Sequence, residues 1–245
     1  MLAVQPVRNG GESCPRARDN PHCSQCSGRS LSVCAALEQE EYTALERILH
    51  TRCFDKHATL FSEGELSSVV FNITAGMVRL YRLLPDGRRQ IIGFAMPGDF
   101  LGLALADKNA FSADALTDVQ ACQFDRREFS ALLDEKPHLL RRLHAIAGHE
   151  LGLAQDQMII LGRRTAEEKV AAFLIGLRDR WARVSGASVN LPLPMTRQDI
   201  ADFLGLTIET VSRMFSKLAR EKLIVVTPDG VRLLDRGALE KRAQS

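Results

Sequence analysis

Three cysteines near the amino end of the chain have a spacing that could bind a metal. Cys23, Cys26 and Cys34 form the pattern C-x2-C-x7-C, and Cys122 lies far downstream. Thiolates are the ligands of structural zinc and of iron–sulfur clusters, and four of them can complete either kind of site. The spacing does not separate the two, although a zinc ribbon would show a second C-x2-C. We therefore expect these four cysteines to hold either a tetrahedral metal ion or a four-iron cluster.

The two remaining cysteines are weaker candidates. Cys14 precedes a proline in a polar stretch and is a further candidate ligand. Cys53 is expected to be a small buried apolar residue, which is a common role for a cysteine. That role suits Cys122 less well, and it does not suit Cys23 or Cys26, because the segment around them is polar. In a reducing compartment such clustering indicates metal or redox chemistry rather than disulfides.

The segment from residue 195 to 223 is a second candidate site, because it reads as two short helices around a tight turn. Thr196 is a natural N-cap for a first helix over 196–203, and Asp199 follows three residues later. Gly205 lies where the chain must turn, and glycine tolerates the positive φ that such a turn can need. Thr207 then caps a second helix. The pattern is typical of a helix-turn-helix.

The second of these helices separates an inner face from an outer one. Its expected inward stripe consists of Ile208, Val211, Phe215 and Leu218. The candidate DNA-contacting residues are Thr207, Glu209, Ser212, Arg213 and Lys217. An arginine can fork onto guanine, a glutamate can accept from cytosine N4, and a small serine permits close approach. This face therefore predicts a reader of base edges in double-stranded DNA.

A hairpin follows the second helix and strengthens the DNA-binding interpretation. Residues 223–227 and 231–234 are β-rich runs on either side of a Pro-Asp-Gly turn. Such a hairpin is the wing of a winged helix, with Arg232 and Arg236 available for phosphates. An αα-hairpin with an ordinary solvated face is the alternative, and the wing makes it the weaker one.

Composition and length limit the class of protein. With 245 residues the chain can hold two domains with real cores. No apolar run is long enough to span a membrane, and the amino end lacks the pattern of a secretory signal, so we expect a cytoplasmic protein. The net charge of only +2 argues against nonspecific coating of nucleic acid and suits a local basic surface.

The pattern of residues predicts an α+β protein in four parts. Residues 1–36 form a cysteine-rich cluster-binding arm, and residues 37–136 form a β-roll of jelly-roll type, in which glycines punctuate short alternating strands. A helix over 38–50 opens this second part. Residues 137–162 form one long helix, and residues 163–245 form the winged helix-turn-helix domain, in which 190–194 is a short extended linker into the helix-turn-helix.

The long helix has two apolar stripes, so we expect it to pack on two sides. Leu139, Leu143, Ile146, Leu153 and Ile160 form the stripe assigned to its own β-roll. The stripe assigned to the same helix of a second subunit contains Leu140, Ala147, Leu151, Ala154, Met158 and Leu161. The alternative is a helix buried inside a monomer. A homodimer would place two recognition helices on a palindromic operator.

The order of these parts resembles the CRP/FNR superfamily of bacterial transcription regulators. The resemblance covers nearly the whole chain and is closest to the FNR-type and FixK-type, oxygen-responsive branch. It is carried by HCSQC, LFSEGELSS, ITAGMVRLYRLLPDGRRQIIGF, PGDFLG, GRRTAEEKVAAFL and MTRQDIADFLGLTIETVSR. The fold it implies is a cyclic-nucleotide-binding-like β-roll, a dimerisation helix and a winged helix-turn-helix.

The resemblance also implies a function. It assigns Cys23, Cys26, Cys34 and Cys122 to a [4Fe–4S] cluster that oxygen destroys. It implies that the recognition helix reads a half-site similar to TTGAT in genes used without oxygen. A protruding charged hairpin tip, formed by Arg82, Pro85, Asp86, Gly87, Arg88 and Arg89, would contact RNA polymerase at Asp86, Gly87 and Arg88, which favours activation.

Two departures from the FNR pattern stand out. The C-x7-C gap is longer than the C-x5-C of the best-known members. Ala154 stands where FNR proteins often have an acidic residue in the dimer seam, so dimerisation should be easier here, with Glu150 left to supply repulsion.

Other functions fit the residues less well. Binding of a cyclic phosphate needs an Arg-Ser pair at the position of residues 111–115. This chain reads FSADA there, which has no arginine and adds a carboxylate, so we expect that it binds no cyclic nucleotide. A haem or thiol-redox sensor shares the fold and remains the alternative. A jelly-roll metalloenzyme would need a cluster of histidine and carboxylate ligands inside the roll. His57 is the only histidine in the strand-like segment 54–124, so we expect no catalytic residues.

Overall fold

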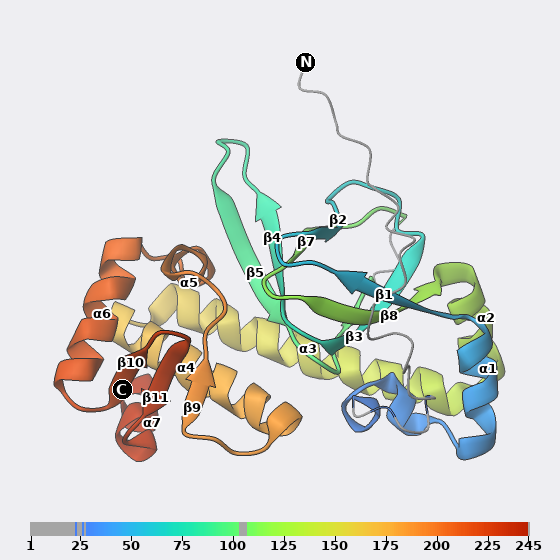
Figure 1. The fold of residues 1–245 in the computed structure, drawn as a ribbon. Coiled ribbons are helices and arrows are strands. Elements are labelled where there is room, and N and C mark those ends of the chain that lie inside the picture. Colours follow the sequence, from blue (N-terminus) through green and yellow to red (C-terminus); the bar gives the residue numbers. More distant parts are fainter. Residues whose placement is uncertain (1–22, 24–25, 27, 103–106, 245) are drawn as a thin grey trace.

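The computed structural model describes residues 23, 26, 28–102 and 107–244 (Figure 1). Cys14 and most of the expected arm lie outside the described residues. The β-roll lies along one long helix, α3 (Pro137–Arg163), and the helix-turn-helix domain lies at the far end of that helix (Figure 1). The α+β architecture predicted from the sequence is confirmed.

The strands of the roll form two four-stranded sheets, with the orders β1-β8-β3-β6 and β2-β7-β4-β5. Their bounds are β1 Leu49–Phe54, β2 Thr59–Phe61, β3 Val69–Ala75, β4 Val78–Leu83, β5 Arg89–Ala95, β6 Phe100–Leu101, β7 Ser112–Ala115 and β8 Val119–Asp125. Apolar side chains that alternate along these strands, such as Phe71, Ile73 and Ala121, fill the core between the sheets. This is the expected β-roll.

The first helical segment is shorter than the sequence suggests. The short 3-10 segments η3 (Arg29–Leu31), η4 (Val33–Ala36) and η5 (Gln39–Glu41) precede α1 (Tyr42–Arg47). The expected helix over 38–50 was wrong at its end, because Leu49 already begins β1 and pairs with Phe124. The pairing with β8 is a long-range contact that helical periodicity does not reveal.

Helix α2 (Arg126–Glu135) leads into the long helix, whose two faces differ as predicted except at Leu153. This residue was assigned to the stripe on the roll, but it is 36% exposed. Leu139 is fully buried against the roll, whereas Leu151 and Met158 are 61% and 70% exposed. Helix α4 (Ala166–Ser185) follows, and its start has the capping box of Thr165 and Glu168.

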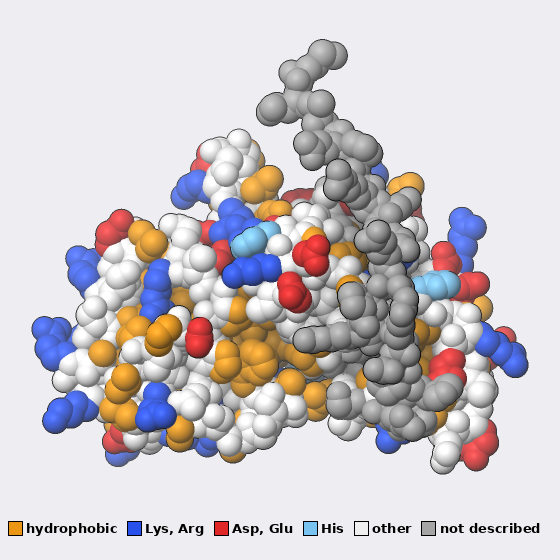
Figure 2. All heavy atoms as spheres, viewed as in Figure 1, with side chains coloured by type: hydrophobic (Ala, Val, Ile, Leu, Met, Phe, Trp, Pro, Cys, Tyr) orange, Lys and Arg blue, Asp and Glu red, His pale blue; other side chains and the backbone are white. Residues whose placement is uncertain are grey.

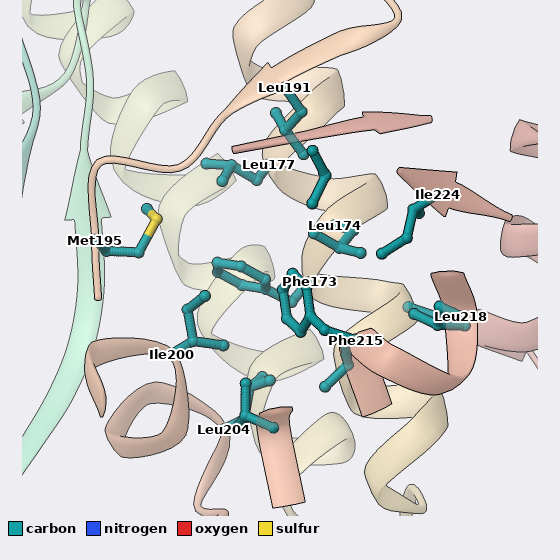
Figure 3. Packing of buried hydrophobic residues seen from close by; sticks show 14 of the residues in the cluster. Phe173, Leu174, Leu177, Leu191, Met195, Ile200, Leu204, Phe215, Leu218 and Ile224 are labelled. Atoms are coloured by element: carbon teal, nitrogen blue, oxygen red, sulfur yellow. The ribbon is translucent and has the colours of Figure 1, made fainter. Parts of the chain in front are cut away.

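The carboxyl-terminal domain consists of α5 (Arg197–Leu204), α6 (Ile208–Arg220), the wing strands β10 (Ile224–Thr227) and β11 (Gly230–Leu233), and α7 (Arg236–Gln244). Its core joins Phe173 of α4 to Ile200 of α5 and Phe215 of α6 (Figure 3). Strand β9 (Asn190–Pro192), expected to be an extended linker, pairs with β11 as a third strand. Helix α7, which packs on α4, was not predicted.

Among the described helices, none combines the length and the apolar character that crossing a membrane requires.

Candidate functional site

The turn of the helix-turn-helix is built by the local signals that the sequence contains. The Thr196 hydroxyl accepts from the Asp199 backbone N–H, and the Asp199 carboxylate accepts from the Thr196 backbone N–H at 2.9 Å. Gly205 ends α5 in the left-handed conformation, with φ 61°. Thr207 begins α6, and its side chain accepts from the backbone N–H of Thr210. The predicted caps are therefore confirmed.

Helix α6 buries three of the four residues expected on its inner stripe. Val211, Phe215 and Leu218 belong to the domain core. Ile208 does not, because its side chain is 38% exposed. It occupies the first position of the helix, where the first turn projects past the core, so its assignment to the stripe was wrong.

The outer face of α6 presents Glu209, Ser212 and Arg213 to solvent. Arg213 Nη2 donates to Thr210 Oγ1 at 3.0 Å, and the Thr207 and Thr210 hydroxyl oxygens are 3.1 Å apart. A backbone N–H and the Thr207 hydroxyl lower the pKa of Glu209, so this carboxyl is ionised at neutral pH. Lys and Arg side chains lie along this end of the molecule (Figure 2). The face thus combines an acceptor, a small hydroxyl and a guanidinium within two helical turns.

Lys217 does not belong to this open face. Its Nζ forms an ion pair with Glu167 of α4, which also binds Arg242 of α7. These two cations lower the pKa of Glu167, so the carboxylate stays charged and keeps both partners. The placement of Lys217 on the outward face was therefore wrong, because the charge that it meets comes from a distant part of the chain.

Arg197 contributes a contact that the sequence gave no reason to expect. Its guanidinium carbon lies 3.3 Å from the centroid of the Phe215 ring, a cation–π contact that ties α5 to α6. Burial lowers the pKa of Arg197. This arginine therefore supports the angle between the two helices and is not a free phosphate contact.

The long β4–β5 hairpin of the roll stands beside α5 (Figure 1). Arg89 Nη2 donates to Asp199 at 2.6 Å and to Asp202 at 3.1 Å. Arg79 donates to Asp199 at 3.3 Å and to Asp114 of β7 at 2.9 Å. The sequence grouped Arg89 with the exposed hairpin tip, but the structure places it in this junction between the two domains.

The cysteines expected to bind a metal lie in one layer, between the arm and the outer face of the β1-β8-β3-β6 sheet. Cys34 of η4 is buried there, and Cys23, Cys26 and Cys122 of β8 are half-buried. The Cys23 backbone N–H donates to Glu46 of α1 at 2.8 Å, which fastens the arm. The fold thus brings Cys23 and Cys122, which are 99 residues apart in the sequence, into the same layer.

These four thiols lie near enough to influence one another's charge. Burial, the nearby Cys34 and the Glu46 carboxylate raise the pKa of Cys23 to about 12. Burial also raises the pKa of Cys34, and burial together with the other three thiols raises that of Cys122. No three ligand side chains of the described residues are gathered closely enough to chelate a single metal ion.

The expectation for Cys53 was wrong. This residue is exposed on β1 rather than buried. It lies near the end of the edge strand β1 and is disulfide-bonded, which the sequence did not predict.

Comparison with known proteins agrees with this architecture. Residues 51–136 match the model of the cyclic nucleotide-binding domain, and residues 168–242 match that of the Crp-like helix-turn-helix domain. The chain is 55% identical to the transcriptional activatory protein AadR of Rhodopseudomonas palustris, over 86% of this chain and 89% of that protein. It is 49% identical to the nitrogen fixation regulation protein FixK of Bradyrhizobium diazoefficiens, over 90% and 93%.

The chain belongs to the CRP/FNR superfamily of transcription regulators. The solved structure of FixK2 from Bradyrhizobium japonicum is similar, with a TM-score of 0.73 and 34% identity over 79% of this chain and 96% of that one. This CRP/FNR regulator therefore binds DNA through its helix-turn-helix domain, and its relative AadR is named as a transcriptional activatory protein.

The face of α3 assigned to a partner is open in this CRP/FNR regulator. Its six residues, Leu140, Ala147, Leu151, Ala154, Met158 and Leu161, are all exposed. Exposed leucine and methionine side chains along one face of a long helix are typical of a surface that pairs with a second copy.

The hairpin tip projects as the sequence predicts. Gly87 has φ 83°, and Leu84 and Arg88 close the turn through a backbone hydrogen bond of 2.8 Å. Arg88 Nε donates to Asp86 at 2.7 Å, and both side chains are exposed. The tip of this CRP/FNR regulator is accessible to a partner protein.

Proposed function

We propose that this regulator is an oxygen-responsive transcription activator controlled by a [4Fe–4S] cluster on Cys23, Cys26, Cys34 and Cys122. The observation that carries the proposal is the convergence of these four thiols in one partly buried layer, in which Cys23, Cys26 and Cys34 all lie near Cys122. A four-iron cluster is held by four thiolates that surround it, so its ligands do not have to meet at a single point. The set of donors and their mutual proximity therefore fit the cluster better than a single ion.

When bound, the cluster would supply the reactivity with oxygen, while the chain transmits its presence. Segment η4, which contains Cys34, packs on α3. Val33 and Leu37 share a core with Leu139 at the start of that helix. Ligation would therefore fix the arm against the same helix whose opposite face is open for a second copy. Loss of the cluster would release the cysteines of the arm, and the arm would then support α3 less firmly.

In the proposed dimer, the α3 seams pair and two α6 helices face one operator. Glu209, Ser212 and Arg213 would read base edges in each half of a palindrome similar to TTGAT. The name of the relative AadR, a transcriptional activatory protein, supports activation. The accessible tip at Asp86, Gly87 and Arg88 is the surface that we propose for RNA polymerase.

We further propose that the roll binds no cyclic nucleotide and that the regulator acts in the cytoplasm, where its DNA target lies. Asp114 stands in the strand where a cyclic phosphate would need cationic partners. Its carboxylate accepts hydrogen bonds from Thr59 at 2.9 Å and from Arg79 at 2.9 Å. This buried carboxylate would repel a phosphate and already occupies the nearest guanidinium.

Operator binding with and without air tests the proposal, on wild type and on Cys23→Ser, with Cys53→Ser as the control cysteine. We expect wild type purified without oxygen to be brown, to bind a palindromic operator, and to lose colour and binding together in air. Cys23→Ser should be colourless and weak in both conditions, while Cys53→Ser should follow wild type. Equal binding in all samples would reject cluster control, and a colourless wild type with zinc or a reversible disulfide would support the thiol-redox alternative.

A further inference from the structure

Asn72 of β3 is a buried polar residue whose side-chain oxygen lacks a hydrogen-bond partner among the described residues. Its side chain is 2% exposed. Its amide oxygen accepts no hydrogen bond from the part of the chain that the structure describes. Buried polar atoms without a partner are rare, and each one needs a reason such as a ligand, a water molecule or a functional role.

The strand register brings Asn72 next to a proposed cluster ligand. Asn72 lies directly opposite Cys122 in the antiparallel pairing of β3 and β8. Directly opposed residues place their side chains on the same face of a sheet, with Cβ atoms about 5 Å apart. On the same strand, Phe71 and Ile73 belong to the core inside the roll, so Asn72 faces the other way.

That other face is the one that the arm covers. Val70, two residues before Asn72, packs in the same apolar cluster as Cys34 and Cys122. A Cβ atom on Gly28 would lie 3.9 Å from Cys26 Sγ and 4.0 Å from the Thr74 Cα. The arm therefore passes over β3 at Gly28, which lies beside Thr74, two residues after Asn72, and Cys26 is adjacent to Gly28.

We propose that the Asn72 side chain donates a hydrogen bond from Nδ2 to the cluster, either to Cys122 Sγ or to a cluster sulfide. The inference rests on the proposed cluster. Sulfur in such a site only accepts, and an amide can turn its nitrogen toward an acceptor because its two ends have nearly the same shape. Hydrogen bonds to the sulfurs stabilise the more negative, reduced cluster and raise its reduction potential. Asn72 thus slows the transfer of an electron from the cluster to dioxygen.

The test compares Asn72→Leu, which keeps the size and removes the donor, with Asn72→Asp, which places a carboxylate there. Asn109→Leu is the matched control, since Asn109 is a partly buried asparagine whose Nδ2 donates to the Ser62 carbonyl, away from the cysteines. After anaerobic reconstitution, the measurements are iron per chain, the midpoint potential of the cluster and the rate of bleaching at fixed oxygen. We expect Asn72→Leu to have a lower potential and bleach several-fold faster, Asn72→Asp to do so more strongly, and Asn109→Leu to match wild type.

An Asn72→Leu protein that folds, binds iron fully and keeps the wild-type potential and bleaching rate would overturn the inference and leave the cluster itself intact. A wild type that takes up no cluster would instead overturn the proposed function, and the inference with it. If Asn72→Leu fails to fold, Asn72→Ser and Asn72→Ala give the same comparison. Serine retains a donor and should stay nearer to wild type than alanine, and equal behaviour of the two would reject the hydrogen bond.

Discussion

Arg89 of the β-roll donates a hydrogen bond of 2.6 Å to Asp199 of the helix-turn-helix, whose carboxylate also caps the first helix of that motif. One side chain therefore connects the β4–β5 hairpin to the start of α5. Since Asp199 is only 1% exposed, its charge depends on Arg79, Arg89 and the Thr196 cap for stabilisation. The position of the DNA-binding domain is thus fixed in part by a sheet of the β-roll.

Replacement of Asp199 by alanine should destabilise the protein strongly. It removes one partner of a buried charge network, which costs about 3–5 kcal/mol, and it deletes a helix cap. Asp86→Ala is the control, because it breaks an exposed Asp–Arg pair that solvent screens and that contributes little to stability. Urea unfolding measures both, and equal losses of unfolding free energy would contradict the role assigned to the junction.

Arg213→Ala should weaken operator binding by about 1–3 kcal/mol and relax the preference at one base pair. Lys217→Ala should have a smaller effect on sequence preference, because Lys217 is paired with Glu167. Titration of wild type and both variants with the operator and single-base variants of it would test this. A larger loss of specificity in Lys217→Ala would show that the ion pair opens on DNA.

Gly98→Ala should release the arm from the roll. Gly98 has φ 99°, and a Cβ atom there would lie 2.5 Å from the Leu31 Cβ. Gly64→Ala provides the control, because Gly64 has φ 83° but open space around it, so it reports backbone strain of about 1–3 kcal/mol without the clash. Limited proteolysis of the arm should accelerate in Gly98→Ala only. Equal protection in both variants would contradict the packing of Leu31 on this loop.

Leu151→Glu should break the proposed dimer without unfolding the monomer, since Leu151 is already 61% exposed. An unpaired charge buried in the helix seam costs more than about 1.4 kcal/mol, so the dimer dissociation constant should rise by more than about tenfold. Leu83→Glu is the matched control, because Leu83 is 62% exposed but lies on the hairpin. Sedimentation measures the association, and an unchanged dimer in Leu151→Glu would exclude this face.

Acid should weaken the contact between η5 and the start of α3. Lys136, the Glu38 backbone N–H and His138 lower the pKa of Glu41 from 4.5 to about 2. A lowered carboxyl pKa stabilises the fold above pH 4.5, and that stabilisation is lost as the pH falls from 4.5 to about 2. Glu41→Gln should therefore flatten the pH dependence of unfolding in this window. If the unfolding free energy of Glu41→Gln fell equally steeply with pH, other carboxyl groups would be responsible for the loss.

Local signals in the sequence determined the elements that depend on residues three or four positions apart. Thr196 and Asp199 specify a capping box, Gly205 a left-handed turn, and Thr207 the start of the next helix, and each of these was predicted. Strand alternation likewise predicted the β-roll, and two apolar stripes predicted a long helix with one face open. The C-x2-C-x7-C spacing singled out the arm.

Tertiary structure alone decided which distant residues meet. Arg89 reads as part of a charged turn and Lys217 as part of an open helix face, yet each finds a carboxylate contributed by another domain or helix. The same is true of β9, whose partner strand lies about 40 residues away, and of Asn72, which only the register of β3 and β8 places opposite Cys122. Caps and turns are fixed by bonds within a few residues. Ion pairs, strand partners and the cysteine layer depend on how the whole chain closes, which no short stretch of sequence encodes.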